Sequence, residues 1–267
     1  MNHYFNALLA IAALVPSATA GASCEGLGSL SLPEAKITTA QSVAAGDFTP
    51  PSGATLTSTA RGTVPVQPIP NLPAFCRVAA TLAPSKDSDI KVEVWMPASG
   101  WNGKFQAVGN GGWSGAINYG ALASAVSHGY ASASTDTGHA GGSAEFAFGH
   151  PEKLIDFAYR SEHEVTVKAK AIIAAFYGSG PKLSYWNGCS SGGKQGLKEA
   201  QKYPGDFDGI IAGAPANNWV ALLEWEEHDY REAIEAIRRG HADFKAGRTQ
   251  PAAEVFEELR EKHGLPR

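Results

Sequence analysis

The chain has 267 residues, which is enough for one sizeable α/β domain, although length alone would also allow two smaller ones. With 43% apolar and 18% charged residues, a globular core is expected and a disordered chain is excluded. The net charge is −4 and no basic stripe is present, so we expect neither nucleic acid nor a membrane as a partner. The composition does not indicate an oligomeric state.

The first 20 residues have the pattern of a secretory signal peptide. An apolar run from Phe5 to Val15 precedes Ala18-Thr19-Ala20, which matches the A-x-A pattern of a cleavage site. The run is too short to span a bilayer. A buried N-terminal helix is the alternative, because no Lys or Arg precedes the apolar run. We expect residues 1–20 to be removed and the protein to be secreted or periplasmic.

The chain contains three cysteines, an odd number for an exported protein. Cys24 and Cys76 both lie near the expected mature N-terminus, so we expect a disulfide between them. Cys189 would then remain without a partner.

Residues 21–75 are rich in Ser, Thr, Ala and Pro and show little periodicity. We interpret them as an extended segment that lies over a core and is tied down by the disulfide. Alternating apolar and polar residues then predict half-buried antiparallel strands at Arg77–Leu82 and Ile90–Met96. The shorter and more apolar segments Lys104–Val108 and Tyr130–Ser134 are typical of buried parallel strands.

The next segment, Ser161–Tyr177, is predicted to be a helix, because its apolar residues recur at helical spacing and Gly178 follows. A strand is predicted at Leu183–Asn187, then a helix that ends near Lys202, then a strand at Gly209–Ala212. Strands that alternate with helices predict an α/β fold, with a mostly parallel sheet flanked by helices.

The last part of the chain, residues 224–267, has a much higher share of charged residues than the glycine-rich body. Two apolar stripes at helical spacing, the first including Ile234 and the second including Phe256, predict a pair of amphipathic helices. The simpler interpretation is a solvated helical tail. The alternative is a segment of unrelated origin, joined by a frameshift or by recombination.

Ser190 is the candidate nucleophile. A serine hydroxyl alone is a poor nucleophile at neutral pH, and it needs a base and donors for the oxyanion. Gly188-Cys189-Ser190-Ser191-Gly192 matches the G-x-S-x-G elbow and lies between a predicted strand and a predicted helix, as that motif requires. The spacing of the motif excludes Ser191 as the nucleophile. The backbone N–H of Ser191 is instead predicted to donate to the oxyanion.

A second glycine-rich loop, Gly109–Gly115, follows the strand predicted at Lys104–Val108. In the elbow fold a loop of this kind provides the other oxyanion N–H, which predicts Gly111 or Gly112 as the donor. A tight structural turn is the alternative. The loop does not bind nucleotides by the G-x-G-x-x-G pattern, because Ser114 stands where the last glycine is required.

The catalytic base is the part of the hypothesis that the sequence does not supply. The elbow fold places its acid and histidine after the serine. The histidines after Ser190 are His228, His241 and His263, which lie in the charged tail and are expected to face solvent. His139 and His150 precede the serine and are out of order. No H-E-x-x-H or C-x-x-C spacing is present, so no metal site is predicted.

Several stretches together resemble one known family. They are Trp101–Phe105, Gly109–Gly112, Ser134–His139, Gly149–Lys153, Asp156–Arg160, Gly188–Gly193, Tyr203–Ile210 and Gly213–Asn217. The chain resembles the tannase and feruloyl esterase family of secreted α/β-hydrolases, which includes the mono(hydroxyethyl) terephthalate hydrolase. The resemblance implies hydrolysis of carboxylic esters of aromatic acids such as gallate or ferulate through an acyl-serine intermediate, with a small-molecule aromatic ester as the partner.

The chain departs from the family after its nucleophile half. In the family, the cysteine before the nucleophile pairs with a cysteine directly after the catalytic histidine, and this chain contains no His-Cys pair. It also lacks a match to the family's late Asp and to its large lid, which holds a calcium site, so no cofactor is expected. We therefore expect residues 21–223 to form a partial α/β-hydrolase domain, without the C-terminal strands and lid, and with little or no turnover.

The alternative function is that of a non-catalytic protein whose tail binds a protein partner, because the segments 246–251 and 254–259 faintly resemble the end of a small bacterial antitoxin. A general lipase or peptidase is disfavoured by the family-specific stretches.

Overall fold

The computed structural model describes residues 21–51, 67–113 and 115–218, the backbone of 55–59 and 62–65, and a few positions in the tail. The predicted signal peptide and nearly all of the predicted 224–267 tail lie outside the described residues, so both remain predictions. The chain divides into two compact units, Met1–Pro215 and Ala216–Arg267.

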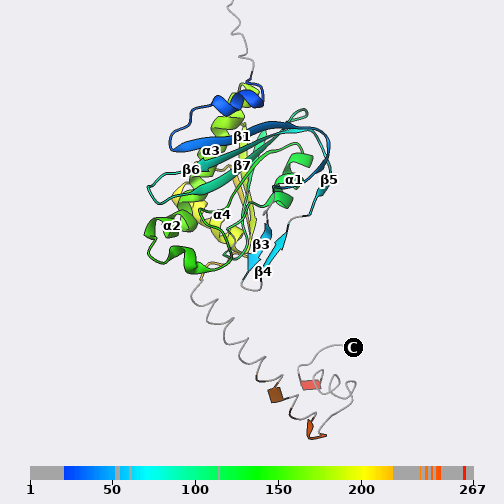
Figure 1. The fold of residues 1–267 in the computed structure, drawn as a ribbon, viewed down its shortest axis with the longest axis vertical. Helices are drawn as coiled ribbons and strands as arrows, with labels where there is room; N and C mark the ends of the chain where they lie inside the picture. The colour runs from blue at the N-terminus through cyan, green and yellow to red at the C-terminus, as the bar shows by residue number, and fades with distance from the viewer. Residues whose placement is uncertain are drawn as a thin grey trace, which may run out of the picture. The chain divides into compact units, whose positions relative to one another are not determined.

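A seven-stranded mixed sheet forms the centre of the first unit, in the order β1-β6-β7-β9-β8-β10-β11. Figure 1 labels β1, β6 and β7 of this sheet. The strands are β1 (Ala35–Val43), β6 (Phe75–Leu82), β7 (Ile90–Pro97), β8 (Lys104–Val108), β9 (Ala131–Thr135), β10 (Leu183–Cys189) and β11 (Gly209–Gly213). The pairs from β1 to β9 are antiparallel, and the pairs from β9 to β11 are parallel. The predicted α/β fold is confirmed, and the parallel half of the sheet carries the predicted serine turn.

The N-terminal segment contributes more regular structure than its composition predicts. After the 3-10 turn η1 (Glu25–Ser29), β1 pairs antiparallel with β6 at the edge of the sheet. Two small ribbons lie outside the sheet, β2 (Gly46–Phe48) with β5 (Ile69–Leu72), and β3 (Thr55–Thr59) with β4 (Gly62–Pro65). The predicted disulfide between Cys24 and Cys76 is present, with Cα atoms 5.6 Å apart, and it ties the start of η1 to β6.

The helices surround the sheet and connect its parallel strands. They are α1 (Tyr119–Ser127), α2 (Pro151–Ile155), α3 (Ser161–Tyr177) and α4 (Ser191–Lys202), with a 3-10 turn η2 (Ala144–Ala147) and a π-helical turn η3 (Asp156–Arg160). Helix α3 has the predicted bounds and ends at Gly178, whose φ of 75° lies in the left-handed region that glycine adopts easily. Helix α1 was not predicted. The Asn118 side chain caps it by accepting from the Ala121 N–H at 3.1 Å.

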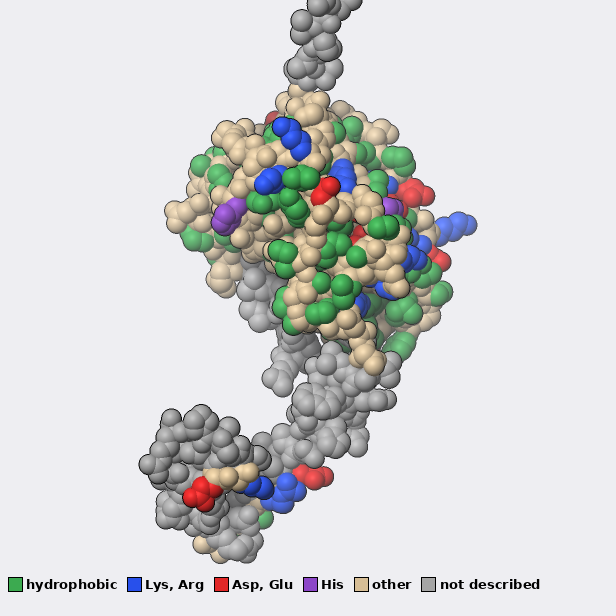
Figure 2. All heavy atoms as spheres, turned by 180° about the vertical axis from the view of Figure 1, so that it is seen from behind, with side chains coloured by type: hydrophobic (Ala, Val, Ile, Leu, Met, Phe, Trp, Pro, Cys, Tyr) green, Lys and Arg blue, Asp and Glu red, His purple; other side chains and the backbone are tan. Residues whose placement is uncertain are grey.

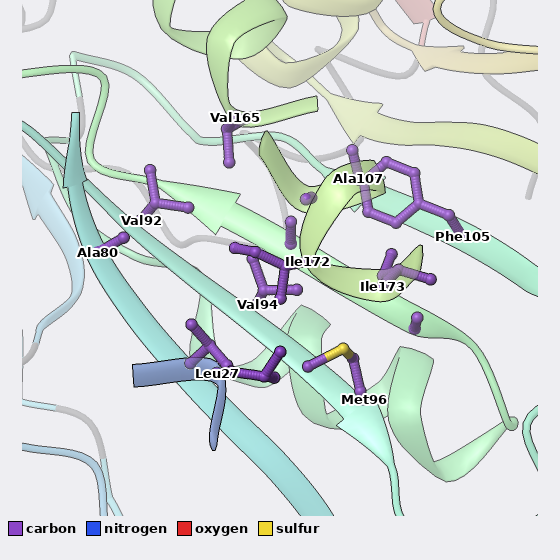
Figure 3. Close-up of a cluster of buried hydrophobic side chains, with 14 of the residues drawn as sticks. Leu27, Ala80, Val92, Val94, Met96, Phe105, Ala107, Val165, Ile172 and Ile173 are labelled. Atoms are coloured by element: carbon purple, nitrogen blue, oxygen red, sulfur yellow. The ribbon is translucent and has the colours of Figure 1, made fainter. Parts of the chain in front are cut away.

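The sheet buries a separate apolar core on each face. Along β7, Val92, Val94 and Met96 pack with Ile172 and Ile173 of α3 (Figure 3). The residue between two of them on β7, Trp95, belongs to a second cluster with Phe75 and with Leu122 of α1. Because successive strand residues point to opposite faces, β7 contributes side chains to both cores. The sheet that carries the serine turn is therefore packed on both of its faces.

On the face drawn in Figure 2, Lys and Arg side chains lie among apolar and uncharged ones, near the top of the hydrolase unit and along its right side. No helix among the described residues combines the length and hydropathy needed to cross a bilayer.

Candidate active site

The carboxyl ends of four neighbouring strands, β9, β8, β10 and β11, meet at one edge of the sheet because these strands are parallel. Three non-glycine residues just beyond these ends have positive φ angles, namely Thr137 (59°), Ser190 (59°) and Ala214 (35°). Such backbone conformations cost about 1–3 kcal/mol each and concentrate at functional sites. This edge is therefore the candidate active site.

Ser190 lies at the turn from β10 to α4 with φ 59° and ψ −120°, and its side chain is exposed. The Ser190 N–H donates to the Gly213 carbonyl oxygen at 3.0 Å, and the Ser190 carbonyl accepts from the Lys194 N–H at 3.0 Å. The neighbouring strand and the helix thus hold the strained backbone in place. This is the strand–turn–helix geometry that the G-x-S-x-G motif predicts.

The glycines of the turn are required by close backbone contacts. A Cβ atom on Gly188 would lie 2.4 Å from the carbonyl oxygen of Gly192. A Cβ atom on Gly193 would lie 2.4 Å from the carbonyl oxygen of Gly213. Because real Cβ atoms do not approach oxygen so closely, only glycine allows β10, α4 and β11 to meet around Ser190.

The second glycine-rich loop contacts the serine turn directly. A Cβ atom on Gly109 would lie 2.6 Å from the Gly192 Cα, and the Ser191 hydroxyl donates to the Gly112 carbonyl oxygen at 2.8 Å. Gly111 and Gly112 face open space at their Cβ positions. The structure therefore brings the three predicted oxyanion residues, Ser191, Gly111 and Gly112, to one place beside Ser190. It also buries the Ser191 hydroxyl, which agrees with the choice of Ser190 as the candidate nucleophile.

A buried polar network supports this loop, and the sequence did not reveal it. The Asn110 N–H donates to Gln195 Oε1 at 3.0 Å, and Gln195 Nε2 donates to Asn110 Oδ1 at 3.1 Å and also to Glu162. The Asn110 amide donates further to the Ala116 and Thr135 carbonyl oxygens. Asn110 and Gln195 are 85 residues apart, so no local pattern could have indicated the pair. The network fixes the loop to the start of α4.

His139 lies close to this loop but cannot act as the base in this arrangement. Its Nε2 contacts the Trp113 carbonyl oxygen at 2.7 Å, and its Nδ1 contacts the Thr137 hydroxyl at 3.1 Å. A carbonyl oxygen only accepts, so Nε2 must carry the proton. Burial lowers the pKa of His139, which favours the neutral form of the ring, and the ring stacks on Phe146.

The other described histidines are also engaged elsewhere. His128 contacts the Ser124 carbonyl oxygen at 2.7 Å, His150 contacts Asp87 at 2.9 Å, and His163 contacts Asp206 at 2.6 Å. His228, His241 and His263 lie outside the described residues. Cys189 is exposed and forms no disulfide within the described chain.

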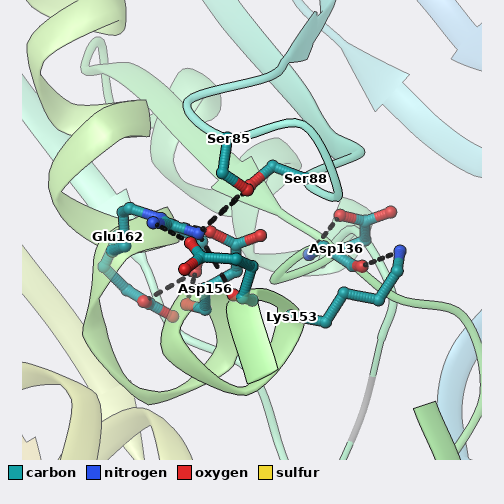
Figure 4. Close-up of polar contacts among 10 residues, drawn as sticks. Ser85, Ser88, Asp136, Lys153, Asp156 and Glu162 are labelled. Carbon is teal, nitrogen blue, oxygen red and sulfur yellow. Dashed lines mark hydrogen bonds and ion pairs between the residues drawn. The ribbon is translucent and has the colours of Figure 1, made fainter. Parts of the chain in front are cut away.

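The stretch Asp156–Arg160, one of those that resemble the family, takes part in a cluster of polar contacts. The Arg160 guanidinium donates to Asp156 at 2.6 Å and to Glu152 at 2.7 Å, and it reaches the Ser88 hydroxyl at 3.2 Å. Figure 4 shows this cluster beside the separate contacts of Asp136. These contacts connect the π-helical turn to the turn before β7. The stretch Asp156–Arg160 therefore holds together two segments that surround the site.

The fold and the strained serine define the α/β-hydrolase class. The chain belongs to the tannase and feruloyl esterase family, whose model matches residues 76–237. That match runs beyond residue 223, and the domain boundary predicted there remains a prediction.

Comparisons with individual proteins agree with this family. An uncharacterized esterase of Xanthomonas campestris pv. campestris is 43% identical over 215 residues, which are 80% of this chain and 35% of that protein. A probable feruloyl esterase B-2 of Neosartorya fischeri is 43% identical over 58% of this chain and 30% of its own length. The crystal structure of an esterase from Aspergillus oryzae matches 78% of this chain and 40% of its own, with 39% identity and a TM-score of 0.69. The chain thus spans about a third of the length of the curated relatives it matches.

Proposed function

We propose that this chain carries the nucleophile half of a serine carboxylesterase that cleaves esters of aromatic acids such as ferulate or gallate. The observation that carries the proposal is the strained conformation of Ser190, with φ 59° and ψ −120°, at the turn from β10 to α4. Such a turn exposes the serine hydroxyl while it aims the next backbone N–H at the same point. The names of the relatives, which include feruloyl esterase, support the aromatic acid as the acyl group.

In the proposed reaction, the Ser190 hydroxyl attacks the ester carbonyl carbon and loses its proton to a base. The negative charge on the carbonyl oxygen is stabilised by the Ser191 N–H and by an N–H of Gly111 or Gly112, and the N-terminus of α4 adds a favourable dipole. The alcohol leaves with the proton, and water then releases the acid from the acyl-serine.

Acylation of Ser190 tests the proposal directly. We expect purified chain mixed with p-nitrophenyl ferulate, with imidazole supplied as an external base, to gain the mass of one feruloyl group, and peptide mapping to place that group on Ser190. The Ser190→Ala variant should gain no such mass, and the surface variant Ser29→Ala should behave as the unchanged chain. An adduct that persists in Ser190→Ala, or no adduct at all, would contradict the proposal.

Turnover is a separate question, because the described histidines all have other partners. Loss of one triad member typically lowers kcat by about 10⁴ or more. We therefore expect the 267-residue chain to release little or no ferulate or gallate from the methyl esters. Substantial release that Ser190→Ala abolishes would refute this expectation and indicate a base among the residues that are not described.

We further propose that the protein is exported. The Ala18-Thr19-Ala20 pattern and the Cys24–Cys76 disulfide support an oxidising compartment. N-terminal sequencing of the protein recovered from the producing cells should begin at Gly21, and an intact Met1 would contradict export by cleavage.

A further inference from the structure

Three side chains with metal-binding chemistry meet on the flank of the hydrolase unit. They are His163 of α3, Glu199 of α4 and Asp206 in the connection from α4 to β11. One ligand atom from each lies within 4.8 Å of the other two. His163 precedes the other two by more than 30 residues, which explains why no ligand spacing was recognised there. The fold alone brings them together.

Neighbouring residues hold the backbone of Asp206 and the ring of His163 in place. The Asp206 N–H donates to the Tyr203 carbonyl oxygen at 2.9 Å, and the Asp206 carbonyl accepts from Lys170 of α3. The Tyr203 ring stacks on the His163 ring with centroids 3.8 Å apart. A preformed arrangement of this kind needs little ordering to bind an ion.

Glu199 is the side chain that indicates a ligand. The residue is 1% exposed, and no N–H or O–H group donates to either of its carboxylate oxygens within the described structure, while the neighbouring Asp206 carboxylate can accept only from a protonated Glu199. A buried carboxyl group without a partner is costly, and it requires either a bound proton or a nearby cation. Burial and the nearby carboxyl groups of Glu162 and Asp206 raise the pKa of Glu199 to about 9, so a proton is the competing solution.

We propose that His163, Glu199 and Asp206 bind a divalent transition-metal cation, with Zn²⁺ as the best match. One imidazole and two carboxylates are typical zinc ligands, and a water can complete the tetrahedron. Mg²⁺ and Ca²⁺ prefer oxygen ligands alone, so the histidine disfavours them. The side chains of His163 and Asp206 are 28% and 15% exposed, so an ion can enter from solvent.

Zinc binding would break one existing contact and would link three segments of the chain. Ligand atoms around zinc lie about 3.4 Å apart, so the 2.6 Å contact between His163 and Asp206 must open, with loss of the proton between them. The ion would then link α3, α4 and the connection to β11. Glu199 lies two turns along α4 from Ser190, so we assign the site a structural role. The lid calcium implied by the family resemblance is a different site, because these three residues belong to the hydrolase body.

Zinc binding to the purified, untagged chain tests the proposal. The Cys189→Ser background removes the exposed thiol as a competing ligand. In isothermal titration with ZnCl₂ we expect saturable binding of one ion per chain and a Tm that rises with zinc and falls again with EDTA. Cobalt(II) should give the visible absorption of a tetrahedral site.

Three variants separate this site from other histidines. Glu199→Gln and His163→Gln should each weaken zinc binding by about tenfold or more. His150→Gln is the matched control, because His150 also contacts a single carboxylate, that of Asp87, at 2.9 Å, and it should bind as the parent does. If the parent protein shows no saturable site, or if Glu199→Gln binds zinc unchanged, the proposal is wrong and Glu199 is a protonated acid. If a variant fails to fold, the absence of saturable zinc binding to the parent protein still refutes the proposal.

Discussion

The hydroxyl of Ser191 donates a 2.8 Å hydrogen bond to the carbonyl oxygen of Gly112, which joins the residue after the candidate nucleophile to the glycine-rich loop. Ser191 is 2% exposed, so the bond is shielded from water. One side chain therefore sets the distance between the two proposed sources of oxyanion donors. The backbone N–H of Ser191 remains available for the substrate, because this contact uses only the hydroxyl.

The Ser191→Ala variant removes this bond and keeps the backbone N–H. Because the Gly112 carbonyl loses a shielded donor, we expect the free energy of unfolding to fall by about 1–2 kcal/mol. Urea denaturation followed by circular dichroism measures the change. Ser29→Ala, which removes an exposed hydroxyl bonded to the Gly26 carbonyl, should change stability by less than about 0.5 kcal/mol. Equal effects of the two changes would contradict the role given to Ser191.

The Gly188→Ala variant tests the tight packing of the serine turn. The new Cβ atom would lie 2.4 Å from the Gly192 carbonyl oxygen, so the turn must shift, and we expect a loss of about 2 kcal/mol or more. The midpoint of thermal or urea unfolding reports it. Gly205→Ala is the control, since its Cβ atom has nothing within 4 Å. A stable Gly188→Ala protein with a normal melting curve would show that the turn has more space than described.

The Cys24–Cys76 disulfide closes a loop with a sequence separation of 52 residues. Cross-links of this span stabilise proteins mainly by restricting the unfolded chain. Replacing both cysteines with serine should lower the free energy of unfolding by about 2–4 kcal/mol. Cys189→Ser should leave it nearly unchanged. A reducing agent should destabilise the parent protein and have no effect on the double variant, and any other pattern would contradict the pairing.

The carboxyl group of Asp136 predicts how the stability of the protein depends on pH. Burial raises the pKa of this carboxyl to about 7, even though the N–H groups of Gly138 and Lys91 donate to it. The folded protein therefore holds a proton that the unfolded chain has already lost between about pH 4 and pH 7. Since the folded state binds more protons there, stability falls as the pH rises through this window.

The Asp136→Asn variant keeps the accepting oxygen and cannot ionise, so it should lose this part of the pH dependence and gain stability at pH 8 relative to the parent. Urea unfolding at several pH values measures the effect, with the exposed Glu145→Gln as the control. Parallel pH profiles of the parent and Asp136→Asn would show that Asp136 ionises in the folded protein at a pH well below 7.

The parts of the fold that the sequence predicted are those whose periodicity reflects burial directly. The bounds of β8 and α3 agree with the predicted ones, because their apolar residues face a core and Gly178 marks the helix end. Strand β1 escaped prediction because it lies at the sheet edge and gains its order from pairing with β6. Its residues are at most half-buried, and their alternation of exposure is interrupted at Thr39 and Ala40.

The candidate site likewise has one part that the sequence predicted and one part that it did not. The serine turn was predictable, because a strand, two glycines and a helix are consecutive in sequence. The Asn110–Gln195–Glu162 network and the positive φ of Thr137 arise from contacts between distant segments, and a single sequence contains no local sign of them.

The mixed sheet has a consequence for how a growing chain assembles. Both partners of β7, which are β6 and β9, have been synthesised by residue 135, and β8 can already pair with β9 at that point, whereas its second partner β10 follows only at residues 183–189. Local antiparallel pairing is fast, and parallel pairing across long connections is slow. The antiparallel half can therefore form while the chain is still emerging from the ribosome and offer β9 as a template. The half that bears Ser190 is added to it last.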